Sequence, residues 1–126
     1  MSAYTASRSP AAYKQQSILT APRGQLVVML YDGCVRFLGQ AAQAMRAERP
    51  GEAGERLSRA EAIVDELLST LDLEQGGVIA SRLQGIYVWS TQTLIKARLD
   101  QDAEAIETVA ELFGELRESW AQIAAA

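Results

Sequence analysis

The sequence predicts an all-α protein, an antiparallel up-down-up-down four-helix bundle with a short N-terminal arm or extra helical turn. Three observations support this fold class. Four separate segments have apolar residues spaced three and four apart, the period of a helix with one buried side. The connections between these segments are short, so consecutive helices are expected to lie side by side and run antiparallel. No segment shows the alternation of a β-strand, and we expect residues 1–126 to form a single domain with one core.

The first helix is predicted over residues 22–47. It begins at Pro22, although Thr20 offers a cap one turn earlier. It ends before Arg49-Pro50-Gly51, a helix stop followed by a turn. The preceding residues 1–19 begin with a Ser- and Ala-rich stretch that has no helical stripe, so they are predicted to form a mobile arm.

The second and third helices are predicted over residues 52–71 and 78–99, with a break at Gly76-Gly77 between them. The second has one apolar stripe, formed by Leu57, Ala60, Val64, Leu67 and Leu71. In the third, the predicted core stripe consists of Ile79, Leu83, Ile86, Leu94 and Ala97, with Tyr87 at its edge.

The fourth helix is predicted over residues 103–123, with Asp102 as the residue that caps its first turn. Its apolar residues follow a heptad order and comprise Ile106, Val109, Phe113, Leu116, Trp120 and Ile123. The opposite side is a solvated acidic face made of Glu104, Glu107, Glu111, Glu115 and Glu118.

Composition excludes several classes of function. Twelve basic and 16 acidic residues give a net charge of -4, which argues against a general nucleic-acid or anionic-membrane binder. The chain has no histidine, which excludes His-based acid-base catalysis, His-containing catalytic triads and His-containing metal sites. Its glycines do not have the spacing of a phosphate-binding loop. We therefore predict no enzymatic activity, no cofactor and no metal. Cys34 is interpreted as a small buried thiol, and the absence of an apolar run of about 20 residues or of a signal peptide predicts a cytoplasmic protein.

Two helices contain more apolar residues than one core-facing side requires. In the first helix the core stripe is predicted on Leu26, Leu30, Cys34, Phe37, Ala41 and Met45, and a second stripe on Val28, Tyr31, Val35 and Ala42. The third helix has a second stripe on Val88, Ile95 and Leu99, with Val78 and Trp89 on a further flank. Scattered exposed apolar residues are common, and bundle helices can be buried on wide arcs. Aligned surplus positions on two helices equally indicate a surface for another helix or for the chain's own N-terminal arm.

Four short motifs follow one another along the chain: YKQQSILTA at residues 13–21 with MLYDGC at 29–34, the LDLEQGGVIA segment at 71–80 followed by Leu83 and Tyr87, DAEAIETV at 102–109, and LRESW at 116–120. In this order, and over about residues 4–123, the chain resembles the family of flagellar secretion chaperones that bind flagellin. The start of the first helix departs from the family's usual Ser-Pro-Gly-Glu, since it reads Pro22-Arg23-Gly24-Gln25 here. The third helix is also more apolar and less basic than is usual in the family.

The resemblance implies a cytoplasmic helical bundle that holds the C-terminal helices of flagellin, prevents premature polymerisation and helps deliver it to the cytoplasmic domain of the flagellar type III export gate. From composition we predict no nucleic-acid partner and no membrane insertion, and we expect a monomer or weak dimer when free. A regulatory adaptor that sequesters a regulator of flagellin synthesis, and an obligate homodimer, remain alternatives. The residues predicted to contact partners are Tyr13, Ile18, Leu19, Val28, Tyr31, Val35, Tyr87, Val88, Trp89, Ile95 and Leu99.

Overall fold

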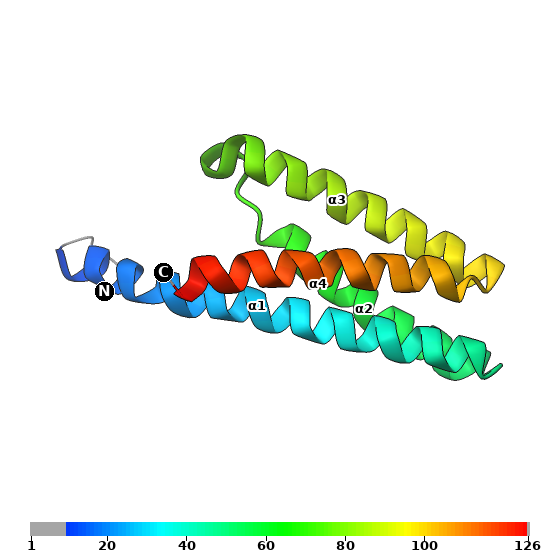
Figure 1. The fold of residues 1–126 in the computed structure, drawn as a ribbon. Coiled ribbons are helices and arrows are strands. Elements are labelled where there is room, and N and C mark those ends of the chain that lie inside the picture. The colour runs from blue at the N-terminus through cyan, green and yellow to red at the C-terminus, as the bar shows by residue number, and fades with distance from the viewer. Residues whose placement is uncertain (1–9, 126) are drawn as a thin grey trace.

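The computed structural model describes the backbone of residues 10–125 and the side chains of residues 24–122, and within this range it contains four helices and no strand. The helices are α1 (Pro10–Arg46), α2 (Pro50–Ser69), α3 (Leu73–Asp100) and α4 (Ala103–Ala125). α1 packs closely against α2 and α4, and α3 contacts the same two helices less extensively (Figure 1). The prediction of an all-α antiparallel four-helix bundle is confirmed.

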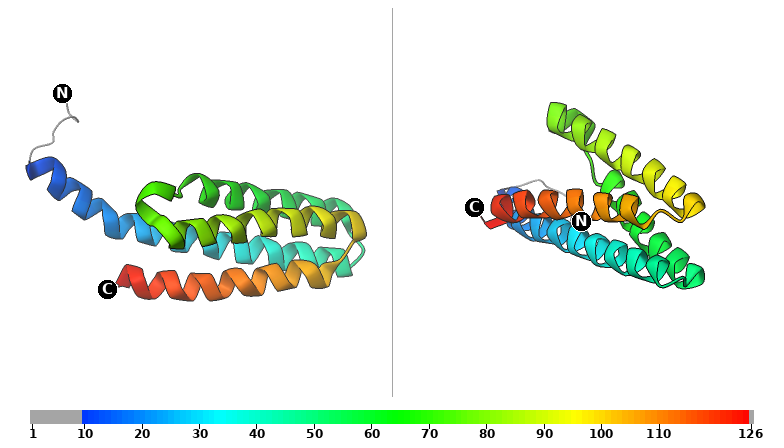
Figure 2. Two further views of the ribbon diagram at one scale, coloured as in Figure 1. Left: turned by 90° about the horizontal axis from the view of Figure 1, so that it is seen from above. Right: turned by 45° about the vertical axis from the view of Figure 1, so that its right-hand side comes forward.

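α1 begins twelve residues before its predicted start, at Pro10 rather than Pro22. Residues 10–19 of the predicted mobile arm are therefore helical, and residues 1–9 lie outside the described part of the chain. Pro10 occupies the first helical position, where its missing N–H costs nothing, and the residues after it include Ala, Lys and Gln, which are good helix formers. The N-terminal turns of α1 project beyond the other three helices (Figure 2).

The other helix boundaries are explained by their caps. α2 begins at Pro50, a favoured first helical residue, rather than at the predicted residue 52. α3 begins early because the Asp72 carboxylate accepts hydrogen bonds from the backbone N–H groups of Glu74 and Gln75, both at 3.1 Å. The Asp102 carboxylate accepts one from the N–H of Ala105 at 3.1 Å, which confirms the predicted cap of α4.

The predicted break at Gly76-Gly77 is present as a kink inside α3. Gly77 has φ +55° and ψ -130°, a backbone conformation that residues other than glycine rarely adopt. The chain therefore changes direction here, and the main part of α3 diverges from the bundle towards this end (Figures 1 and 2).

A matched pair of glycine substitutions tests this kink. Gly77→Ala is expected to destabilise the protein by about 1–3 kcal/mol, because alanine is strained at this φ. Gly85→Ala, in the helical part of α3 where nothing lies within 4 Å of an added Cβ, is expected to stabilise by about 0.5–1 kcal/mol. Urea melts measure both. A stable Gly77→Ala variant would show that residue 77 does not hold the positive φ in solution.

Three aromatic rings from three helices meet in the middle of the core. The ring of Phe113 contacts Tyr31 edge-on, with centroids 5.7 Å apart, and lies 6.1 Å from the ring of Tyr87. The hydroxyl groups of Tyr31 and Tyr87 form a buried hydrogen bond that joins α1 to α3 across the bundle. Burial raises the pKa of both phenols.

The second stripe of α1 does not form the predicted outward surface. Tyr31 and Ala42 are buried, and Val28 and Val35 are partly buried, with Val35 packed against the core. The physical reason is that α1 has two close neighbours, α2 and α4, so its buried arc is wider than one stripe. Tyr87, predicted at the edge of the core, is only 2% exposed.

Two predicted core residues are exposed instead. Ile79 is 71% exposed because α3 diverges from the other helices at this end. Leu26, taken from the sequence as part of the core stripe of the first helix, is 57% exposed. Gly33 of α1 lies against the Ile63 side chain of α2. Because the two helices are antiparallel, Leu26, two turns before Gly33, is level with the C-terminal end of α2 at Ser69. Leu26 therefore has little of α2 to pack against.

Candidate partner-binding surface

The outward side of α3 exposes four of the residues that the sequence predicts to contact a partner. Val88 is 41% exposed, Trp89 45%, Ile95 50% and Leu99 79%. The opposite side of the same helix buries Leu83, Tyr87, Ser90, Leu94 and Ala97 in the core. These four apolar side chains are therefore accessible while the opposite side of α3 packs against the bundle.

α3 is fixed to the bundle mainly at its C-terminal end. The Arg98 guanidinium donates hydrogen bonds to the carbonyl oxygen of Gly54 at 3.1 Å, to the Ser58 hydroxyl at 3.4 Å and to the Glu61 carboxylate at 2.7 Å. This partly buried network ties α3 to α2. Three exposed residues, Leu99, Asp100 and Gln101, then lead to Asp102, the cap of α4, so this end of the candidate surface has a fixed position.

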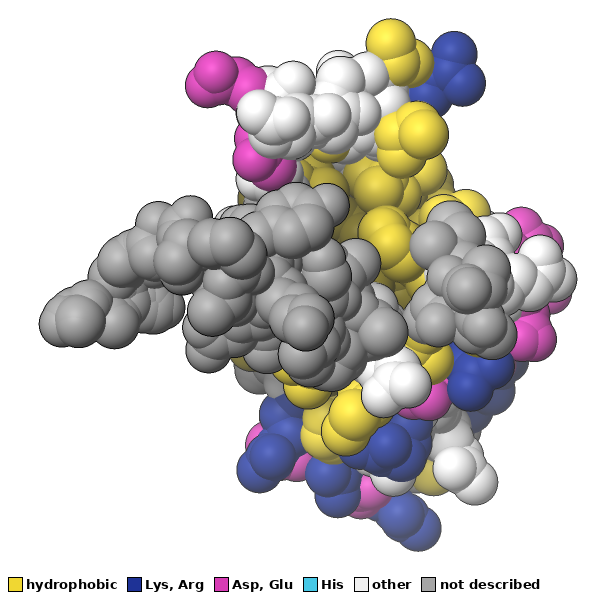
Figure 3. Space-filling view, turned by 90° about the vertical axis from the view of Figure 1, so that its left-hand side faces the viewer, with side chains coloured by type: hydrophobic (Ala, Val, Ile, Leu, Met, Phe, Trp, Pro, Cys, Tyr) yellow, Lys and Arg dark blue, Asp and Glu magenta, His cyan; other side chains and the backbone are white. Residues whose placement is uncertain are grey.

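The N-terminal end of α3 exposes further hydrophobic side chains that the sequence analysis did not assign to the surface. Leu73 is 47% exposed, and on α1 Met29 is 65% exposed. Hydrophobic side chains also fill the space between this end of α3 and the other helices (Figure 3). Their exposure depends on where neighbouring helices end, which apolar periodicity does not indicate.

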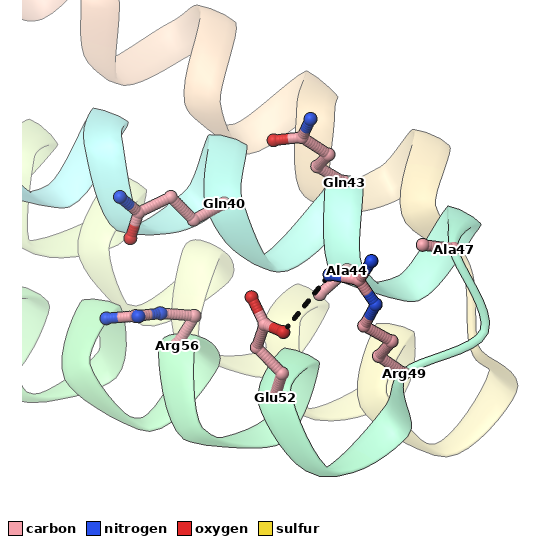
Figure 4. Close-up of a pocket in the computed structure, with 7 residues that line it drawn as sticks. All are labelled: Gln40, Gln43, Ala44, Ala47, Arg49, Glu52 and Arg56. Atoms are coloured by element: carbon pink, nitrogen blue, oxygen red, sulfur yellow. Dashed lines mark ion pairs between the residues drawn. The ribbon is translucent and has the colours of Figure 1, made fainter.

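A depression between α1 and α2 at their connected end is polar in character. It is lined by Gln40, Gln43, Ala44, Ala47, Arg49, Glu52 and Arg56 (Figure 4). Arg49 and Glu52 form an ion pair across 3.5 Å. The lining offers amides and charges but no nucleophile, and it lies away from the apolar side of α3.

Within the described residues, no group of three or more Cys, Asp or Glu side chains is arranged to hold a metal ion. None of the helices, over the same part of the chain, has the length and apolar character needed to cross a membrane.

Comparison with known proteins identifies the family of the chain. The model of the family described as flagellar protein FliS matches residues 6–126. The chain belongs to the FliS family. It is 38% identical to the flagellar secretion chaperone FliS of Salmonella typhimurium over 95% of this chain and 92% of that protein. The proteins of the same description from Campylobacter jejuni and Bacillus subtilis are 35% and 31% identical, over 89% and 88% of this chain and 88% and 82% of theirs.

Membership of the FliS family confirms the resemblance found in the sequence and makes a chaperone role in flagellar secretion the general function of the chain. The side chains of Tyr13, Ile18 and Leu19, which the sequence predicts to contact partners, lie outside the described side chains, although their backbone belongs to α1.

Cys34 is buried in this FliS-family bundle, as predicted. Burial raises the pKa of its thiol to about 12, and its sulfur lies 3.9 Å from the carbonyl oxygen of Ala60. Since the thiolate is the reactive form, almost none is present near pH 8.

A thiol reagent at pH 8 is therefore expected to label Cys34 only as fast as the bundle opens, and at the rate of a free cysteine in urea. Spectrophotometric labelling of native and unfolded protein measures both rates. Rapid labelling of the native protein would contradict the buried position.

Proposed function

We propose that this protein is an export chaperone for flagellin. In the cytoplasm it binds the C-terminal helical segment of newly made flagellin, prevents its premature polymerisation and assists delivery to the cytoplasmic domain of the flagellar type III export gate. The observation that carries this proposal is the exposed apolar side of α3, formed by Val88, Trp89, Ile95 and Leu99, in a chain whose relatives are described as flagellar secretion chaperones.

The physical basis is helix-on-helix packing. An amphipathic client helix cannot bury its apolar side in water alone, and an exposed apolar side of α3 offers it a matching surface. Because α3 is anchored by Arg98 and by the hydroxyl contact between Tyr31 and Tyr87, the surface is preformed and little ordering is needed on binding. Tyr31 and Tyr87 are buried, so they position the surface and do not form it.

The N-terminal part of α1 is proposed to take part as well. Tyr13, Ile18 and Leu19 belong to a segment of α1 that projects beyond the other helices (Figure 2). The proposed role is contact with the client or with the export gate, as the resemblance of this segment to the family implies.

Mixing the purified chain with flagellin from its own organism tests the proposal. A 1:1 complex is expected in size-exclusion chromatography with light scattering, together with suppression of filament growth. Flagellin lacking its C-terminal helices is the control and is expected not to bind. Absence of a complex with intact flagellin would contradict the proposal.

The free chain should sediment as a monomer or weak dimer. A stable dimer without a client would indicate that the apolar surfaces pair with each other and do not wait for flagellin.

A further inference from the structure

α3 contains two apolar repeats on opposite sides, each with the alternating three-four spacing of a coiled-coil seam. The inward seam faces the core, and its members, all buried, are Ala80, Leu83, Tyr87, Ser90, Leu94 and Ala97. The outward seam has the same spacing from residue 78 to residue 99, and its members are all exposed: the apolar residues Val78, Val88, Ile95 and Leu99, together with Ser81, Gly85 and Gln92. α3 therefore has the residue pattern of a helix that packs on two opposite sides, and α2 and α4 cover only one of them.

The outward seam permits close approach of another helix. In its first half, Val78 is followed by the small residues Ser81 and Gly85, and nothing lies within 4 Å of the position where a Cβ of Gly85 would stand. Its second half has the large apolar side chains of Val88, Ile95 and Leu99, with the polar Gln92 between the first two. A partner helix can thus lie along the whole seam, with its own apolar residues packed between these positions.

Up to Leu99, the charged residues beside the outward seam are all basic, and Asp100 follows on the same edge as Lys96, with which it pairs. Arg82, Trp89 and Lys96 follow one edge at intervals of seven residues, and all three are exposed. Between Val78 and Leu99 the chain has no acidic residue, although it has 16 acidic and 12 basic residues overall. In coiled coils the residues that flank the seam select the partner by charge.

Both flanking cations are available to a partner. Arg82 forms no ion pair with any side chain in the described part of the chain. Lys96 pairs with Asp100 at 2.6 Å, but both side chains are at least half exposed, and a solvent-exposed pair of this kind contributes little and is readily exchanged. Arg98 is different, because its guanidinium is held by Glu61 on the α2 side.

We infer that the outward seam of α3 binds a client helix with an apolar three-four seam flanked by acidic residues. This inference specifies the client chemistry and rests on the proposed function. Arg82 and Lys96 are 14 residues apart, which is about 21 Å along a helix, so the client helix has at least about four turns, with a carboxylate near each end. A second copy of the chain fits poorly, because an antiparallel pair of α3 helices would place Arg82 of one opposite Lys96 of the other.

Designed peptides test the charge selection without flagellin. Three helix-forming peptides of four heptads share one apolar seam and carry Glu, Gln or Lys at the flanking positions. Fluorescence anisotropy of labelled peptide measures binding to the full chain. We expect the Glu peptide to bind at least tenfold more tightly than the Lys peptide, and this ratio to decrease as salt is added.

Charge reversal on the protein is the second part of the test. The variant with Arg82→Glu and Lys96→Glu is expected to invert the ranking of the Glu and Lys peptides, and Ile95→Lys to abolish binding of all three. Arg49→Glu, in the connection between α1 and α2 and outside the outward seam, is the control and should leave the ranking unchanged. Circular dichroism confirms that each variant is folded. Equal binding of the three peptides, or a ranking that survives the double reversal, would overturn the inference.

Flagellin measured on the same variants separates this inference from the proposed function. If flagellin binding is lost with Ile95→Lys but is unaffected by the double reversal, the chaperone proposal stands and the acidic-client inference is wrong. If the peptides follow the expected ranking and flagellin does not bind the wild-type chain, the charge selection stands and flagellin is not the client.

Discussion

Phe113→Ala is expected to destabilise the protein by about 3–5 kcal/mol, a large share of the stability of a domain of this size. Phe113 is fully buried and contacts Tyr31 and Tyr87, so its removal leaves a cavity where α1, α3 and α4 meet. The two tyrosine hydroxyls restrict collapse of that cavity, because moving either ring would break their hydrogen bond. Urea denaturation followed by circular dichroism measures the change in the free energy of unfolding.

Trp89→Ala is the matched control for this prediction. It also truncates a large aromatic side chain, but Trp89 is 45% exposed on the outward side of α3, so a change below about 1 kcal/mol is expected. If both substitutions have the same effect, or if Phe113→Ala costs less than about 1 kcal/mol, the aromatic centre of the core is placed wrongly.

Ile95→Lys is expected to weaken flagellin binding by about 3 kcal/mol, roughly a hundredfold in Kd, while leaving helicity and stability nearly unchanged. In the free protein the lysine is solvated, because Ile95 is 50% exposed. In the complex its ammonium group would have to be desolvated against an apolar client helix. Val88→Lys is expected to act in the same way. Isothermal titration calorimetry with purified flagellin gives the affinity.

Ser119→Lys, at an exposed position of α4, is the control, and its affinity should equal that of the wild type. Unfolding of the Ile95→Lys or Val88→Lys variant would show that the outward side of α3 is part of the core. Unchanged affinity in well-folded variants would place the client elsewhere on the bundle.

The buried sides of α2 and α4 were predictable from sequence, because each helix has a single apolar stripe and is polar on its other sides. Leu57, Ala60, Val64 and Leu67 of α2 are all buried, and Asp102 caps α4 as its position suggested. The outward apolar residues of α3 were also identified, since Val88, Ile95 and Leu99 fall opposite the core stripe in any straight helix.

What the sequence did not reveal depends on tertiary arrangement. The surplus apolar residues of α1 are taken up by contact with two helices, so Tyr31 became core although its spacing looked like a second surface. Ile79 has core spacing, yet the divergence of α3 after the kink at Gly77 leaves it in solvent. The early start of α1 at Pro10 was missed because residues 10–21 are helix-forming by propensity without an apolar stripe.

Fluorescence of Trp89 tests most directly whether the outward side of α3 is the client-binding surface. Trp120→Phe removes the other tryptophan of the chain, so that emission reports Trp89 alone when the flagellin used contains no tryptophan. On formation of the 1:1 complex, we expect a blue shift of the emission and strong protection from acrylamide quenching, because a client helix covers the exposed indole. A complex in which Trp89 remains as accessible as in the free protein would contradict the account.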